Sequence, residues 1–205
     1  MFFCLISSTS CLDFGNRNKT DPDASSPQGT ETGNPNIYNQ EEFGLTLEYP
    51  SGWVVLERGP ASAAEPIKNP VTGETIDVGS LSENYLASGT LPTSEASTTV
   101  LTDGQSVSTV YYITLEETPD TLLDYLATVL GPKAGGVASE TFPEFSNPHS
   151  TGREYVNSKP GIKGGELKEY FFLKERTLFY FAAEILPQKE ADLKFQQIIN
   201  SVRFP

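Results

Sequence analysis

The residues of this chain that could do chemistry are mainly carboxylates, and several of them lie in one short stretch. Glu116 and Glu117 follow an apolar run that predicts a strand, and Asp120 and Asp124 lie at the start of the helix predicted next. Because the strand end and the helix start are neighbours, we expect these carboxylates to cluster. Carboxylate oxygens are the ligands that Ca²⁺ prefers, and they also suit Mn²⁺. The stretch is therefore a candidate site for Ca²⁺ or Mn²⁺. The alternative is a solvated helix start whose acids complement the helix dipole.

The sequence offers little to a catalytic mechanism. It contains no G-x-S-x-G, Walker, H-E-x-x-H or paired C-x-x-C motif. His149 is the only histidine and lies in "SNPHS", which indicates a loop. A hydrolase would need a pocket that unites His149 with a nucleophile such as Ser146 or Ser150. We therefore predict no catalytic residue, and an enzyme is the least favoured hypothesis.

The charge balance restricts the class of partner. The formal net charge is −13 and the pI is near 4.4, whereas nucleic-acid binding depends on Lys and Arg side chains that neutralise phosphates. An anionic lipid surface is disfavoured for the same reason. No apolar run approaches the roughly 18 residues that a membrane-spanning helix needs. We expect no nucleic-acid partner and no contact with a membrane except through a lipid anchor.

That anchor is predicted from the opening stretch, "MFFCLISSTSC", which holds both cysteines, Cys4 and Cys11. An apolar core, small residues and a Cys follow one another, as at the end of a bacterial secretory signal. The order resembles the lipobox of bacterial lipoproteins, in which the Cys after small residues receives the lipid. The resemblance implies that residues 1–11 are the remnant of a signal peptide and that Cys11 is lipidated. It also implies a location in the bacterial cell envelope, in the periplasm or anchored to the outer membrane. The alternative is an ordinary disordered N-terminus with a chance cysteine.

Residues 12–40 are predicted to form a disordered tether. The segment is mostly polar, and such a segment cannot bury enough surface to offset its conformational entropy. A flexible chain of this length reaches roughly 30 Å. We expect the globular domain to occupy residues 41–205.

Hydrophobic periodicity predicts the elements of that domain. "FGLTLEYP" alternates apolar and polar residues as a strand does, and "TPDTLLDYLATVLGP" has helical spacing after a cap at Thr118. Hairpins are predicted across a two-residue turn at Asp103 and Gly104 and across Glu175 and Arg176. The last predicted helix has one apolar face, made of Ala191, Phe195, Ile198, Ile199 and Val202.

The central predicted strand is apolar on both faces, because Tyr111 and Ile113 alternate with Val110 and Tyr112. A strand of this kind is covered on both sides. The predicted fold class is therefore α+β, a mostly antiparallel β-sheet flanked by helices.

Three stretches together resemble the family of the extrinsic PsbP subunit of photosystem II and its non-photosynthetic bacterial relatives. These stretches are "FGLTLEYPSGW", "TLLDYL" and "YFAAEI" followed by "FQQIINSVRF". The resemblance implies an α/β/α sandwich over residues 41–205 and a non-enzymatic accessory role. Some relatives are linked to the handling of Mn or Ca, but no ligand set of theirs maps onto these residues.

The preferred hypothesis is an extracytoplasmic interaction module that docks an unknown envelope protein. An exposed sheet edge or an aromatic loop, with Trp53 among its residues, would make the contact. The alternative is a small-ligand or divalent-cation-binding protein that uses Glu116, Glu117, Asp120 and Asp124.

Overall fold

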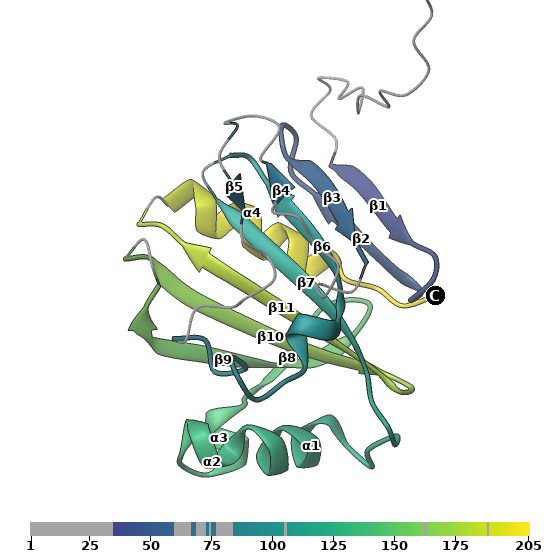
Figure 1. Ribbon diagram of the computed structural model, residues 1–205, viewed down its shortest axis with the longest axis vertical. Helices are drawn as coiled ribbons and strands as arrows, with labels where there is room; N and C mark the ends of the chain where they lie inside the picture. Colours follow the sequence, from purple (N-terminus) through teal and green to yellow (C-terminus); the bar gives the residue numbers. More distant parts are fainter. Residues whose placement is uncertain are drawn as a thin grey trace, which may run out of the picture.

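A computed structural model of the chain describes residues 35–59, 67–68, 73, 75–76, 84–104, 106–161, 164–187 and 189–205. Its centre is a seven-stranded antiparallel sheet with the strand order β3-β6-β7-β11-β10-β9-β8 (Figure 1). The strands are β3 (Val54–Arg58), β6 (Ser97–Thr102), β7 (Val107–Thr114), β8 (Glu144–Ser146), β9 (Thr151–Pro160), β10 (Glu166–Lys174) and β11 (Thr177–Ile185).

The remaining elements flank this sheet. They are the strand pairs β1 (Asn36–Gln40) with β2 (Leu45–Tyr49) and β4 (Ile67–Lys68) with β5 (Thr75–Ile76), and the helices α1 (Leu122–Val129), α2 (Gly131–Ala134), α3 (Ala138–Thr141) and α4 (Lys189–Ser201). Among the described residues, no helix is long and apolar enough to cross a membrane. The predicted class, α+β with a mostly antiparallel sheet flanked by helices, is confirmed.

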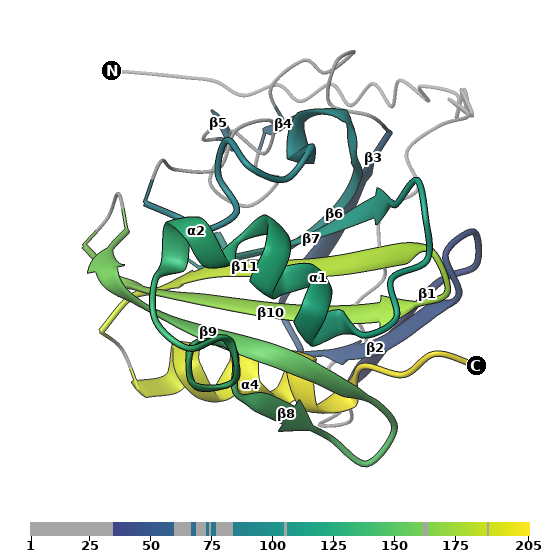
Figure 2. The ribbon, with the colours of Figure 1, turned by 90° about the horizontal axis from the view of Figure 1, so that it is seen from below.

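The sheet has a separate hydrophobic core on each face. On one face, α4 and the β1–β2 hairpin pack on Phe172, Phe179 and Phe181. On the other face, α1 and the segment 85–96 pack on Phe171 and Tyr180. Figures 1 and 2 show the sheet lying between α4 and α1. The prediction of strands covered on both sides is therefore confirmed.

The C-terminal elements also agree with their predictions. The β10–β11 hairpin turns at Glu175 and Arg176, with Lys174 opposite Thr177. Glu175 takes up the positive φ of 54° that so short a turn requires. The predicted apolar face of α4 and the residue after it are buried, namely Ala191, Phe195, Ile198, Ile199 and Val202.

The boundary of the folded domain lies earlier than predicted. Residues 36–40, expected to belong to the tether, form β1 and pair with β2. Tyr38 explains the pairing, because its hydroxyl donates to Glu57 Oε1 at 2.7 Å and lies 3.0 Å from Thr99 Oγ1. The rest of the predicted tether and the predicted signal remnant, residues 1–34, lie outside the described residues.

Two turn predictions were wrong in detail. The chain between β6 and β7 is longer than a two-residue turn, because Thr102 pairs with Val107 and Asp103 Oδ1 accepts a bond from the Ser106 amide. Helix α1 is capped by Thr121, whose Oγ1 accepts from the Asp124 amide at 3.0 Å, and not by Thr118. In both places a side chain fixes a turn that residue types alone do not distinguish from its neighbours.

Candidate functional site

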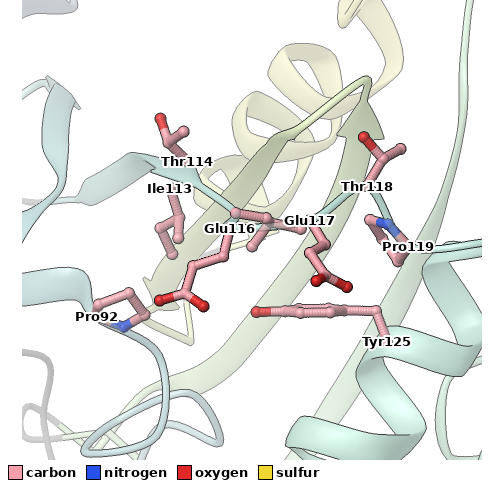
Figure 3. A pocket seen from close by; sticks show the side chains of 9 residues that line it. Pro92, Ile113, Thr114, Glu116, Glu117, Thr118, Pro119 and Tyr125 are labelled. Atoms are coloured by element: carbon pink, nitrogen blue, oxygen red, sulfur yellow. The ribbon is translucent and has the colours of Figure 1, made fainter.

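An open pocket of about 460 Å³ lies where β7 ends and the chain crosses to α1 (Figure 3). Its walls combine apolar groups, including Ile113, Leu115, Pro119 and Tyr125, with carboxylates. Ligand pockets in proteins span roughly 300–1,000 Å³ and are mostly apolar with a few placed polar groups. The pocket therefore has the size and the lining of a binding site.

The end of β7 is held by the β10–β11 turn. The Leu115 amide donates to the Arg176 carbonyl at 2.8 Å, and Nε of Arg176 donates back to the Leu115 carbonyl at 2.9 Å. Nη2 of Arg176 donates to the same carbonyl and to that of Glu116. The guanidinium thereby fixes the backbone at the point where Glu116 and Glu117 leave the sheet.

Glu116 and Glu117 supply the charge of the pocket. Both are exposed, and within the described residues neither carboxylate takes part in a hydrogen bond or an ion pair. Figure 3 shows the Glu117 carboxylate next to the ring of Tyr125 and the Glu116 carboxylate between Pro92 and the hydroxyl end of Tyr125. Both carboxylates therefore lie on the Tyr125 side of the pocket, and no cation of the described residues pairs with either.

Tyr125 reaches the pocket from the first turns of α1. Thr121 caps this helix, and the Thr121 hydroxyl also donates to Asp124 Oδ2 at 2.7 Å. Leu126 of α1 and Leu130 at its C-cap are fully buried in the core on this face of the sheet. Burial raises the pKa of the Tyr125 hydroxyl, so the ring is neutral at physiological pH.

Pro92, on the far side of the pocket, belongs to the segment 84–96, which is anchored to the sheet by a buried acid. Glu169 of β10 is 0% exposed. Its carboxylate accepts bonds from the amides of Leu86 at 2.8 Å and Ala87 at 3.4 Å. It also accepts from the Tyr180 hydroxyl at 2.7 Å and from Asn157 Nδ2 at 3.2 Å. Burial raises the pKa of Glu169, although each of these bonds acts in the opposite direction.

Lys133 of α2 holds the same segment from the helix side. Its Nζ donates to the carbonyls of Tyr85 at 3.0 Å and Ser88 at 2.7 Å. Sequence reasoning missed both Lys133 and Glu169. The sequence contains one signal for Glu169, which directly precedes the apolar run "YFFL" in a predicted strand. An acid that is buried at such a position needs several hydrogen-bond donors around it.

The structure does not gather the predicted metal ligands. Glu116 and Glu117 line the pocket, but Asp120 does not. The carboxylate of Asp124 accepts a hydrogen bond from the Thr121 hydroxyl. Across the ranges that the structure describes, no group of three or more His, Cys, Asp or Glu residues is placed to hold a metal ion. The expected cluster fails because α1 begins after Thr121, so Asp120 lies in the connection before the helix.

Trp53 is not on an exposed loop, and that part of the docking hypothesis was wrong. Its side chain is 5% exposed and belongs to the core on the α4 side of the sheet. Trp53 directly precedes β3, whose first three residues are half-buried. Trp53 therefore has a packing role and offers a partner almost no surface.

The other predicted residues have separate positions. His149 is exposed, and its amide donates to Asn147 Oδ1 at 2.7 Å. The Ser150 hydroxyl donates to the Val202 carbonyl at 2.8 Å, and the Ser146 hydroxyl lies 3.3 Å from Thr151 Oγ1. No hydrogen bond joins His149 to either serine in the described part of the chain. Cys11 lies outside the described residues.

Fold and pocket together define an α+β protein with an open pocket, lined in part by two glutamates, where β7 ends. Comparisons with protein-family models, with curated proteins and with solved structures give no match. The PsbP-like resemblance remains a hypothesis that these comparisons do not address.

Proposed function

We propose that the protein is a non-enzymatic accessory module of the bacterial cell envelope that docks a partner protein through the pocket between β7 and α1. In this proposal a lipid on Cys11 tethers the chain to the membrane, as the lipobox-like stretch implies. One observation carries the docking role. Glu116 and Glu117 lie beside apolar walls in an open pocket, and neither has an ion-pair partner among the residues that the structure describes.

The arrangement suits recognition between proteins. Apolar walls supply the surface whose burial drives association, and a few fixed polar groups supply orientation. Carboxylates at an interface also speed the encounter with a basic partner, because opposite charges steer diffusion. The net charge of −13 adds to this effect for any basic partner.

Site-specific crosslinking in cells tests the docking role. A photoreactive amino acid replaces Thr118, an exposed residue that lines the pocket, in the full chain with its native N-terminus. The matched position is Leu193, which is 61% exposed on α4. We expect one discrete crosslinked product from position 118 and none from position 193.

That product must also depend on the pocket charge. It should disappear when the chain carries Glu116→Gln and Glu117→Gln. It should persist with Glu41→Gln and Glu42→Gln, which remove the same charge from the turn between β1 and β2. Identical products from positions 118 and 193, or a product indifferent to Glu116 and Glu117, would rule out docking at this pocket.

The tether is tested by the intact mass of the protein from its membrane fraction. A chain that begins at Cys11 and carries acyl groups is the expected result. An unmodified soluble chain that retains Met1 would refute the lipid anchor and leave the docking proposal to the crosslinking experiment.

A further inference from the structure

The pocket between β7 and α1 also constrains the chemistry of the group that fills it. Its floor is apolar, one wall is an aromatic ring, and its charged groups are two adjacent carboxylates. We propose that it binds the side chain of an arginine carried on an exposed segment of the partner protein. This inference rests on the proposed docking role and names the residue that docks.

Charge complementarity selects a cation. The carboxylates of Glu116 and Glu117 have no cationic partner within the described residues. The nearby guanidinium of Arg176 does not serve, because its donors are directed to the backbone carbonyls of Leu115 and Glu116. A ligand that brings a positive charge would remove the repulsion between two adjacent anions.

The number of carboxylate oxygens in the pocket favours a cation that has several N–H donors. Each carboxylate offers two oxygens, whereas a guanidinium presents five N–H donors in a planar fork. Bonds between an arginine and carboxylates are charge-assisted and about twice as strong as bonds between neutral groups. A bare divalent ion fits less well, because the pocket holds only two acidic side chains and hard cations take six or more oxygen ligands.

The apolar walls favour arginine over lysine. Pro119 lines the pocket, is half-buried and can cover an aliphatic stem, and the ring of Tyr125 lies next to the Glu117 carboxylate (Figure 3). A guanidinium is weakly hydrated and stacks on aromatic faces, whereas an ammonium holds its water more strongly. Arginine therefore loses less solvation in a pocket whose walls cannot replace lost water.

The pocket is held in shape before any ligand arrives. Arg176 fixes the end of β7, and the Thr121 cap fixes the start of α1. The segment bearing Pro92 is tied down through Glu169 and Lys133. Binding to a site of this kind costs little ordering of the backbone.

A titration followed by amide NMR tests the inference on the purified full chain. The probes are the N-acetyl methylamides of arginine, lysine and citrulline; citrulline keeps the shape of arginine without its charge. We expect the arginine probe to shift the amides of residues 113–119 and Tyr125 in a saturable manner. The lysine probe should bind at least threefold more weakly, and citrulline should cause no saturable shift.

Paired variants assign the binding to the pocket. Glu116→Gln with Glu117→Gln should raise the Kd of the arginine probe at least tenfold. The control pair Glu41→Gln with Glu42→Gln, on the hairpin that covers the opposite face, should leave it within twofold. Tyr125→Leu keeps an apolar wall without a ring and should reduce the preference for arginine over lysine. Equal binding of lysine and arginine, or saturation by Ca²⁺ at lower concentration than by arginine, would overturn the inference.

The results also separate this inference from the docking proposal. If crosslinking at position 118 succeeds and the arginine probe fails to bind, docking stands and arginine is the wrong occupant. If the probe binds the pocket and no crosslink forms, the pocket takes arginine and the docking role falls.

Discussion

Glu169 shows how one buried residue can position a segment that lines a pocket. Its Oε1 accepts from the Leu86 amide and Asn157, and its Oε2 accepts from the Ala87 amide and the Tyr180 hydroxyl. A buried carboxylate is tolerated only where donors replace the water it has lost. Here two of the donors belong to the segment 84–96, so the stability of the charge and the position of that segment depend on each other.

Replacing Glu169 with Gln should therefore destabilise the fold. The amide NH₂ of Gln cannot accept, so it faces donors that then have no acceptor inside the protein. Leaving a buried donor unsatisfied costs about 1–3 kcal/mol, and more where a charge was involved. We expect the free energy of unfolding to fall by about 2–4 kcal/mol. Urea denaturation at pH 7 measures it.

The matched control is Glu166→Gln on the same strand, where the side chain is exposed. Exposed substitutions usually change stability by less than about 0.5 kcal/mol. Equal effects at the two positions would mean that the buried hydrogen bonds of Glu169 contribute no net stability.

We also expect Glu169 to make the free energy of unfolding depend on pH. Burial raises the pKa of Glu169 above its ordinary value near 4.5. The folded state therefore holds this proton more tightly than the unfolded state does. The resulting stabilisation is fully present below pH 4.5 and is lost as the pH rises through the folded-state pKa. The stability advantage of the wild type over Glu169→Gln should shrink as the pH rises above 4.5. An advantage that grows with pH over this range would show that the hydrogen bonds outweigh burial.

At the scale of elements, α1 contributes Tyr125 to the pocket, whereas β7 and the connection after it contribute most of the remaining lining. The helix begins at Leu122, and its cap is Thr121. Thr118 lies in the connection that leads to the helix, and its side chain makes no capping bond. Thr118 and Thr121 therefore have different roles. The structure distinguishes these roles, whereas the sequence pattern alone does not.

Thr121→Ala should destabilise the protein, and Thr118→Ala should not. Loss of a threonine cap costs about 0.5–2 kcal/mol, because an amide of the first turn loses its acceptor. Thermal unfolding of the two variants measures the difference. A larger effect at Thr118 would place the start of the helix where its sequence first suggested.

The elements predictable from sequence are those whose apolar residues repeat. The face of α4 and the alternation from Leu45 to Tyr49 follow directly from such repeats. Strand β1 was missed because "NIYNQ" is mainly polar and is held by pairing with β2 and by the bonds of Tyr38. A strand of this type depends on contacts distant in the sequence, which no local pattern contains.

The candidate site was predictable only in part. Glu116 and Glu117 were identified because carboxylates are visible in a sequence. Tyr125 and Pro92 were not, because their place in the pocket depends on how α1 and the segment 84–96 meet the sheet. Lys133 and Glu169 act from outside the pocket, and their role follows only from hydrogen bonds between distant segments.

At the scale of the whole molecule, the sheet divides the apolar interior into two cores. Consecutive residues of β10 serve different cores: Phe171 packs on Phe142 in the core that includes α1, and Phe172 packs on Phe181 in the core that includes α4. Both phenylalanines are 0% exposed. The pocket lies at the edge of one core and the β1–β2 hairpin on the other, so the two faces can respond separately to a local defect.

Phe171→Ala and Phe172→Ala test this division. Each removes a fully buried ring, which costs about 3–5 kcal/mol through lost burial and the cavity that remains. Amide NMR should then separate the two variants. We expect Phe171→Ala to shift signals of α1 and of the pocket, and Phe172→Ala to shift those of α4 and β2. Because side chains of one strand point alternately to the two faces, the two sets should overlap little. Similar shifts in both variants would mean that the two layers behave as a single core. A loss of less than about 1 kcal/mol in the free energy of unfolding at either position would mean that the core on that face is loosely packed.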